Sequence, residues 1–301
     1  MNKIFSLTLM CLTAFVLMSC SKDDDNSTDY IANSKRLVKS ISYDQNDEVL
    51  YTIEWTYKDN YSCSIKTDKN GGKVKVENFE GSNNILRQQY NWQNGDWVMT
   101  YEEKSVLDAS KRIVSNETTI SNPSIYRIQS TYTYSGDSTI IVGYRNSSEP
   151  TDKIVQVERG DEHETISYTY LGNNQWEETI YEKIVTTYTD SKKNKPSSVI
   201  TYNRSGDVTN RRDYEWSGEN CKVYTTIGNV KYLLEEMTID GTTSTEVHYY
   251  IDWDGSGNSL PAQKTITKKI GNMTEKCMYY MVEEEWKLHN KDVDYYEEVE
   301  K

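Results

Sequence analysis

Apolar and polar residues alternate with a period of two along much of this chain. The segment Lys73-Val74-Lys75-Val76 shows the pattern, and short apolar runs such as Thr139-Ile140-Ile141-Val142 lie between clusters of Gly, Asn, Asp and Ser. Such alternation is typical of strands, because successive side chains of a strand point to opposite faces. No long stretch shows the apolar spacing of a helix. The pattern therefore predicts an all-β protein.

Landmarks of this pattern recur about every 80 residues, as expected of repeated units. They include the isoleucine of one strand and a glycine turn further on, at Ile41, Ile120 and Ile200 and at Gly81, Gly160 and Gly241. Each unit holds about six short strands, which predicts an antiparallel meander of about 18 strands. Residues 34–109, 110–190 and 191–301 form the three units of one continuous domain. The pattern leaves open whether the strands form a long twisted sheet, a two-layer sandwich or a wrapped, barrel-like sheet.

The third unit departs from the other two after Pro261. Terminal repeats are often modified so that they cap an open end. We expect residues 292–300, which are rich in Asp and Glu, to form a charged edge of the sheet. A disordered acidic tail from Asp294 onward is the alternative.

The composition indicates a thin core. Hydrophobic residues make up 36% of the 301 residues, and 25 Tyr stand against 3 Phe. Antiparallel sheets tolerate such a deficit because one of their faces can be solvated. The formal net charge of −13 argues against a nucleic-acid partner, which calls for a basic footprint.

The first 20 residues form a targeting segment that is not part of the fold. Lys3 precedes an apolar stretch, residues 4–17, that is shorter than the roughly 20 residues of a membrane-spanning helix. Leu17-Met18-Ser19-Cys20 resembles a lipobox, which implies that residues 1–19 are removed as a signal peptide and that Cys20 is lipidated. An ordinary secretory signal with an incidental Cys20 is the alternative.

The acidic run Asp23-Asp24-Asp25 follows Cys20 closely and resembles the export signal of Bacteroidota-type surface-exposed lipoproteins. That resemblance implies a protein that is anchored to the outer membrane by lipid, such as palmitate, on Cys20 and is exposed at the cell surface. Residues 20–33 form an acidic, flexible tether. A tether that is merely solvated is the alternative reading of the acidic run.

Tyrosines followed by turns, as in Tyr43-Asp44 and Tyr134-Ser135-Gly136-Asp137, are similar to the YD repeats of RHS-type proteins. The similarity covers residues 35–260 loosely and implies a winding antiparallel sheet. It implies no activity.

Three cysteines remain after the leader, namely Cys63, Cys221 and Cys277. An odd number leaves at least one thiol free or in an intermolecular bond. Cys63 and Cys221 occupy matching repeat positions, so they would meet only in a sheet that closes on itself. The alternative is three half-buried thiols that act as small hydrophobic side chains.

Few residues have the spacing of a chemical site. No Cys or His has zinc-ligand spacing, and no nucleotide-binding motif occurs, so we expect no cofactor. Asp252, Asp254 and Ser256 match the first half of a calcium loop, but Gln263 stands where a bidentate Glu is needed, and a plain hairpin turn explains them better. Adjacent carboxylates such as Glu177-Glu178 point to opposite faces of a strand, which weakens the case for a carboxylate-dependent hydrolase.

Aromatic residues near strand ends are the remaining functional candidates. Those selected are Trp55, Tyr57, Trp92, Trp97, Trp176, Trp216 and Trp253. Flat rings flanked by Asp, Asn and Gln suit a surface that binds a glycan or a protein, whereas cross-strand aromatic ladders would merely stabilise the sheet. The sequence thus favours a non-enzymatic binding lipoprotein, with a structural scaffold as the alternative.

Overall fold

The computed structural model describes residues 35–121, 124–173, 175–177, 180–251 and 258–299, which form 21 β-strands. The strands are β1 (Lys35–Asp44), β2 (Val49–Lys58), β3 (Tyr61–Asp68), β4 (Lys73–Glu80), β5 (Asn84–Gln93), β6 (Asp96–Leu107), β7 (Ile113–Ile120), β8 (Tyr126–Ser135), β9 (Ser138–Arg145), β10 (Pro150–Arg159), β11 (Glu162–Gly172), β12 (Gln175–Trp176), β13 (Glu182–Tyr188), β14 (Pro196–Tyr202), β15 (Val208–Ser217), β16 (Asn220–Ile227), β17 (Val230–Asp240), β18 (Thr243–Ile251), β19 (Ser259–Ile270), β20 (Met273–Val282) and β21 (Glu285–Glu298). Within the described ranges, no helix is long and apolar enough to cross a membrane.

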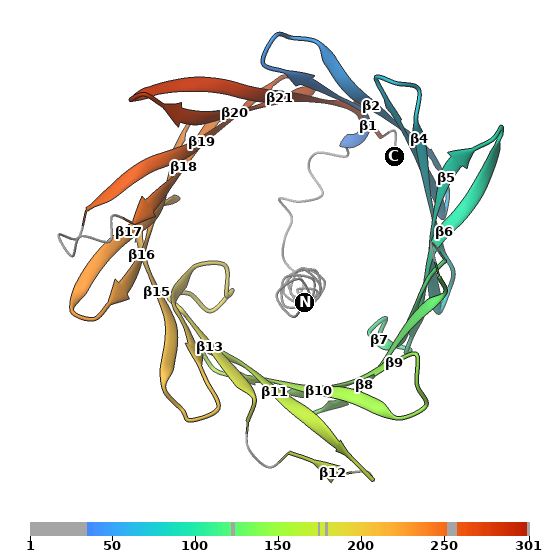
Figure 1. Cartoon of the computed structure of the whole chain (residues 1–301), viewed down its shortest axis with the longest axis vertical. Helices are drawn as coiled ribbons and strands as arrows, with labels where there is room; N and C mark the ends of the chain where they lie inside the picture. The colour runs from blue at the N-terminus through green and yellow to red at the C-terminus, as the bar shows by residue number, and fades with distance from the viewer. Residues whose placement is uncertain (1–34, 122–123, 174, 178–179, 252–257, 300–301) are drawn as a thin grey trace. The chain divides into compact units, whose positions relative to one another are not determined.

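The strands form one antiparallel meander that closes into a barrel (Figure 1). Neighbours in sequence pair with each other, and β1 pairs with both β2 and β21. The short β12 pairs with β11 alone, while β11 pairs directly with β13, so 20 strands make up the ring. Residues 37–297 form one compact unit. The barrel-like alternative is confirmed, and the open sheet and the sandwich are wrong.

The closing strand is the acidic C-terminal segment. Near the β1–β2 turn, the Lys291 ammonium donates a hydrogen bond to Asp47 Oδ1 at 2.6 Å and lies 4.8 Å from the ring centroid of Tyr43. Residues up to Glu298 belong to β21, which is paired on both sides. The predicted charged edge and the predicted disordered tail are therefore both wrong for this segment, because ring closure removes the edge.

The expected number of about 18 strands was too low, mainly because of the third unit. Residues 34–109 hold β1–β6, as predicted, and residues 110–190 hold six strands plus the short β12. Residues 191–301 hold eight strands, because β20 and β21 follow the six that a unit was expected to contain. The threefold sequence repeat itself stays a prediction.

Turn residues fit their backbone conformations. Asp59 begins the two-residue turn between β2 and β3 with a φ of 43°, and the predicted glycine turns at Gly160 and Gly241 have φ of 58° and 57°. Short hairpin turns need such positive φ values, which Gly, Asn and Asp adopt most readily. Local chemistry thus sets where each strand ends.

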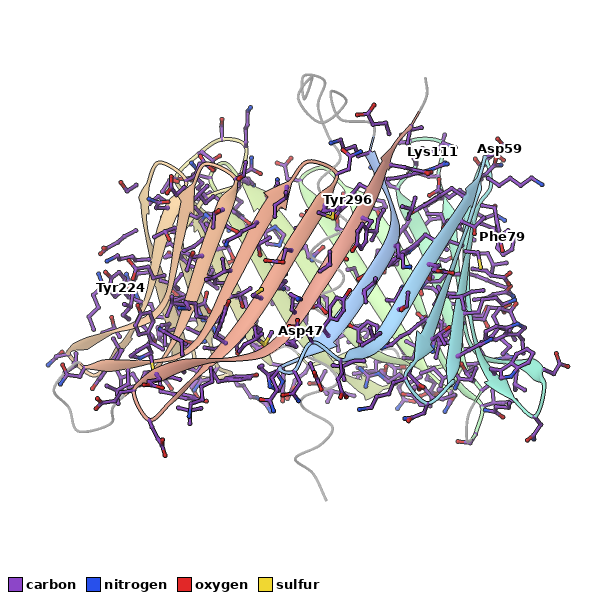
Figure 2. The ribbon with its side chains drawn as sticks, turned by 90° about the horizontal axis from the view of Figure 1, so that it is seen from above. Asp47, Asp59, Phe79, Lys111, Tyr224 and Tyr296 are labelled. Atoms are coloured by element: carbon purple, nitrogen blue, oxygen red, sulfur yellow. The ribbon has the colours of Figure 1, made fainter. Side chains whose placement is uncertain are left out.

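Cross-strand register divides the side chains into an outer and an inner set. Phe79 and Tyr224 lie on the outside of the barrel (Figure 2). Directly paired residues of neighbouring strands share a face. The register of each strand pair therefore tells which residues of the next strand also face outward. The buried hydrophobic residues of the described chain all lie on the inner face; they are Ile141, Cys221, Val223 and Tyr232. A ring of 20 strands is too wide for inward side chains to fill, which explains why so few are buried.

Candidate functional site

The aromatic residues selected from the sequence do not converge on one site. Register places three of them on the inner face, namely Trp55, Tyr57 and Trp216. It places three others on the outer face, namely Trp92, Trp97 and Trp176. Trp253 lies outside the described residues, as do Cys20 and the calcium-loop residues Asp252, Asp254 and Ser256. Their roles as a binding surface, a lipidation site and a cation site stay predictions.

Inner aromatic residues tie neighbouring strands together. Tyr57 Oη donates a hydrogen bond to the Leu37 carbonyl at 2.8 Å, and Trp216 Nε1 donates one to the Pro196 carbonyl at 2.7 Å. Tyr134 makes the same kind of bond across β7 and β8. The polar groups of these rings therefore form hydrogen bonds within the barrel wall.

Outer aromatic residues near the rim that carries the β1–β2 turn form clusters with lysine. In three clusters a lysine ammonium lies within 6 Å of two ring centroids, a distance typical of cation–π contacts. These clusters are Lys75 with Tyr90 and Trp97, Lys153 with Tyr168 and Trp176, and Lys264 with Tyr279 and Trp286. Trp92 and Trp97 also stack edge to face at 5.1 Å. Each of these rings already has partners within the sheet.

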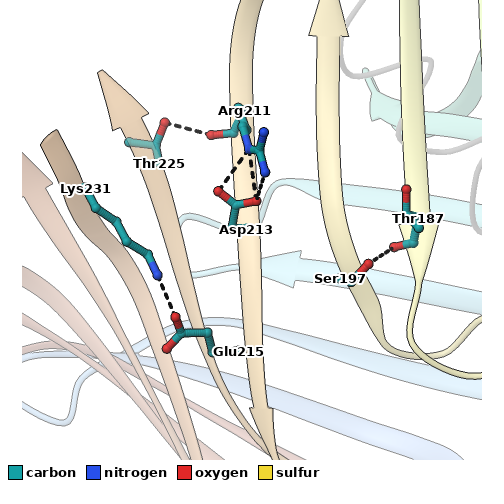
Figure 3. Close-up of polar contacts among 7 residues, drawn as sticks. All are labelled: Thr187, Ser197, Arg211, Asp213, Glu215, Thr225 and Lys231. Atoms are coloured by element: carbon teal, nitrogen blue, oxygen red, sulfur yellow. Dashed lines mark hydrogen bonds and ion pairs between the residues drawn. The ribbon is translucent and has the colours of Figure 1, made fainter. Parts of the chain in front are cut away.

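Charged pairs cover the outer face between the aromatic clusters. Arg211 Nη2 lies 2.9 Å from Asp213 Oδ1, and Lys231 Nζ lies 2.5 Å from Glu215 Oε1; Figure 3 draws both contacts. The same close-up shows hydroxyls of Thr225 and Ser197 donating to backbone carbonyls of neighbouring strands. Lysine holds the pKa of the Glu215 carboxyl below its usual range. Both carboxylates are thus paired with cations.

A small group of possible metal ligands lies on the inner face, on β17 and β18. It comprises Glu235, Glu246 and His248, whose ligand atoms lie within 4.8 Å of one another. His248 Nδ1 is 3.7 Å from Glu235 and its Nε2 is 3.3 Å from Glu246, so the carboxylates flank opposite sides of the ring. Because the two carboxylates approach different nitrogens of a partly exposed ring, this arrangement does not by itself define a metal site.

The three cysteines are free. Cys63 belongs to the outer face and Cys221 to the inner face, so closure of the sheet does not bring the two thiols together. Burial raises the pKa of the Cys221 thiol, which keeps it protonated and unreactive.

A hollow on the outer face combines an exposed aromatic floor with a polar rim. It lies between the β2–β3 and β4–β5 turns and has a volume of about 520 Å³. Its lining residues are Lys58, Asp59, Asn60, Tyr61, Phe79, Glu80, Gly81, Asn84 and Leu86. Asp59 and Phe79 lie on the same outer edge of the barrel, beside the rim opposite Asp47 (Figure 2). A second hollow of about 410 Å³, between Val208 and Ile251, is lined by aliphatic and polar residues without a ring.

We call this depression on the outer face, with the lining residues given above, the Phe79 hollow. The Phe79 ring at its floor packs against the ring of Tyr61. Phe79 and Tyr61 are cross-strand partners whose ring centroids lie 4.9 Å apart at an interplanar angle of 46°. Tyr61 Oη donates a hydrogen bond to Glu77 Oε1 at 2.9 Å, and burial raises the pKa of this phenol, so it stays a donor. A Cβ on Gly81 would meet Asn84 Oδ1 at 1.8 Å, so only glycine lets the Asn84 amide fold over the turn.

The sequence did not single out Phe79, which is one of only three phenylalanines. Its signal is weak, because Phe79 merely precedes a glycine turn at the end of an alternating strand. The hollow depends on Asn60 and Asn84, which come from separate turns and meet only through the pairing of β3 with β4 and β4 with β5.

Comparisons with known proteins add little beyond this geometry. No protein-family model matches the sequence, and no curated protein matches it. Among solved structures, the chain is similar to a porin-like protein from Bacteroides uniformis ATCC 8492, with 8% identity over 88% of this chain and 97% of that chain and a TM-score of 0.29. A TM-score of this size does not establish a shared fold, so the similarity carries no functional inference for this chain.

Proposed function

We propose that this chain is a lipid-anchored, non-enzymatic binding protein of the outer membrane whose barrel stands in water and does not span the bilayer. Lipid on Cys20 holds it to the membrane, and the tether of residues 20–33 leaves the barrel exposed at the cell surface. Its ligand is a glycan or a protein. The leader, the lipobox-like segment and the acidic run support this location.

The charge on the outer face is the observation that carries the proposal. Ion pairs lie on the outer face of the wall at separate points around the ring, with N···O distances of 3.2, 2.6 and 3.1 Å. These pairs are Lys75–Glu77, Lys104–Glu102 and Lys222–Glu236. A membrane-spanning barrel needs an apolar outer band about 25 Å tall, and a lysine at its midplane costs about 2–4 kcal/mol. Lipid contact at this face would therefore cost far more than water contact.

The arrangement of carboxylates favours binding over catalysis. On the outer face Asp213 and Glu215 pair with Arg211 and Lys231, and on the inner face Glu235 and Glu246 flank the His248 ring. The exposed Phe79 hollow favours a binding role over that of a passive scaffold, since a scaffold needs no concave, part-aromatic surface.

The proposal predicts that the chain without its lipid is soluble without detergent. A form that begins at Ser21 should elute as a single monodisperse species in plain buffer, keep a β-sheet circular dichroism spectrum and fail to float with phospholipid vesicles. The native lipoprotein, as control, should float. A shortened chain that stays in solution only in detergent, or that inserts into vesicles and resists carbonate extraction, would show that the barrel spans the membrane.

A further inference from the structure

We propose that the Phe79 hollow is a carbohydrate-binding site that takes a neutral hexopyranose unit of a glycan. This assignment rests on the proposed binding function and names its ligand class and its location. It places the contact at the outer face, between the β2–β3 and β4–β5 turns.

The floor supplies an accessible aromatic face. Phe79 is 37% exposed although it sits on a paired strand between Tyr61 and Leu86. A pyranose ring has an apolar face of weakly positive C–H groups, and the face of an aromatic ring carries negative charge density. The two surfaces are complementary in shape and charge, so the sugar ring stacks on Phe79.

Phe79 differs in this respect from the rings of the three lysine clusters. Lysines lie over Tyr90, Trp97 and their counterparts in the other clusters. Within the described part of the chain, the recorded ring contact of Phe79 is with Tyr61, and no cation lies over it. Its outward face is therefore the one left for a ligand.

The rim supplies groups that match sugar hydroxyls. The amides of Asn60 and Asn84 each donate and accept hydrogen bonds, and the carboxylate of Asp59 accepts them from adjacent hydroxyls. All three residues are exposed. Hydroxyls on neighbouring carbons of a hexose need this mixture of donors and acceptors, which a purely apolar or purely cationic rim lacks.

Backbone bonds hold this rim in place before a ligand arrives. The Glu80 amide donates to the Asn60 carbonyl at 2.8 Å, which fixes one turn beside the other. The Gly81 amide donates to the Asn84 carbonyl, also at 2.8 Å. A rim that is already ordered loses little conformational entropy on binding.

Charge and size select a neutral sugar. The lining residues Asp59 and Glu80 carry two negative charges against the one positive charge of Lys58, so this surface repels sugars that carry carboxylate or sulfate. The volume of about 520 Å³ lies in the range of small-ligand sites, about 300–1,000 Å³. A protein partner would need roughly 800 Å² of contact on this side, and the surface beyond the hollow is covered by ion pairs such as Lys75–Glu77.

The test uses the full-length lipoprotein in a detergent without a sugar head group, applied to a printed array of neutral hexose oligosaccharides and matched oligosaccharides that contain uronic or sialic acid. Any hit is titrated by calorimetry. The variants are Phe79→Ala, Phe79→Tyr, Asn60→Ala with Asn84→Ala, and Trp97→Ala as the matched outer aromatic control. Circular dichroism and melting curves establish that each variant is folded.

Wild type should bind neutral oligosaccharides and not their acidic counterparts. Phe79→Ala should weaken binding at least about tenfold, the asparagine pair should weaken it similarly, and Phe79→Tyr and Trp97→Ala should stay within about threefold of wild type. Absence of binding by folded wild type, equal binding by folded Phe79→Ala, an equal loss in Trp97→Ala, or a preference for acidic sugars each overturns the assignment. The proposal that the barrel stands in water is tested separately, by the solubility and vesicle flotation of the chain that begins at Ser21.

Discussion

At the scale of single residues, the face on which an aromatic ring lies decides its role. Tyr57 and Trp216 face inward and use their polar tips to bind backbone carbonyls of the adjacent strand. Trp97 faces outward and shares Lys75 with Tyr90, whereas Phe79 keeps one face open. Tyr57, Trp216 and Trp97 therefore stabilise the barrel wall, whereas Phe79 is a candidate contact for a ligand.

The lysine clusters predict a measurable coupling between Lys75 and Trp97. Lys75→Met keeps the aliphatic stem but loses the ammonium, which lies 4.2 Å from the Tyr90 ring centroid, 5.4 Å from that of Trp97 and 3.2 Å from Glu77. We expect a loss of about 1 kcal/mol in the free energy of unfolding. A double-mutant cycle with Trp97→Ala, followed by urea denaturation, should give a coupling of about 0.5 kcal/mol.

Lys104→Met is the control for that cycle. Lys104 pairs with Glu102 on the same face, and no ring contact is recorded for it within the described chain. Its loss should lower the free energy of unfolding less than the loss of Lys75 does, as expected of an exposed ion pair. Additive effects of Lys75→Met and Trp97→Ala would contradict a cation–π contribution.

At the scale of elements, β21 is the strand on which closure depends. It pairs with β20 along its length and with β1 at the seam, where Lys291 bonds Asp47. Without β21, β1 and β20 would each present an unpaired row of backbone donors and acceptors. Exposed edges of this kind recruit other chains.

Truncation after Val282 should therefore give oligomers larger than those of the full-length protein, or aggregates, which size-exclusion chromatography with light scattering will reveal. Lys291→Met is the matched control, since it removes the seam contact and leaves β21 in place, and it should keep the size of the full-length protein. A truncated chain that remains folded and monomeric would show that the ring does not depend on this strand.

At the scale of the whole molecule, the barrel is stabilised by the backbone hydrogen bonds between its strands and by many half-buried tyrosines, because few hydrophobic residues of the described chain are buried. Burial, together with the neighbouring Glu103 carboxylate, raises the pKa of Tyr101 to about 12. Burial likewise raises the pKa of Tyr188, Tyr214 and Tyr279. The folded barrel thus disfavours tyrosinate at several points around the ring.

These shifts predict unfolding in alkali. A phenol whose pKa is higher in the folded chain than its unfolded value of about 10 contributes stability below pH 10, and this contribution is lost as the pH rises toward the folded value. Tyrosinate absorbance at 295 nm and loss of the β-sheet signal should therefore rise together above about pH 10.

Tyr101→Phe should make stability fall less steeply with pH in this range. Tyr181→Phe, at a side chain that is 61% exposed, controls for the removal of a phenol hydroxyl as such. Tyrosinate that forms fully while the sheet signal persists would contradict this account.

The sequence by itself determined the local features of this protein. Period-two alternation identified the strands, and turn residues such as Asp59, Gly160 and Gly241 marked their ends, because both signals arise from neighbouring residues. The small apolar fraction indicated a thin core, which the few buried hydrophobic residues confirm.

Only the tertiary structure decided how the ring closes and which face is outside. Alternation separates two faces but does not label them, so it could not tell that Trp97 and Trp216 lie on opposite sides of the wall. Closure joins β1 to β21 across almost the whole chain, and the Phe79 hollow joins two separate turns through strand register. These features depend on contacts between distant residues, which no local pattern encodes.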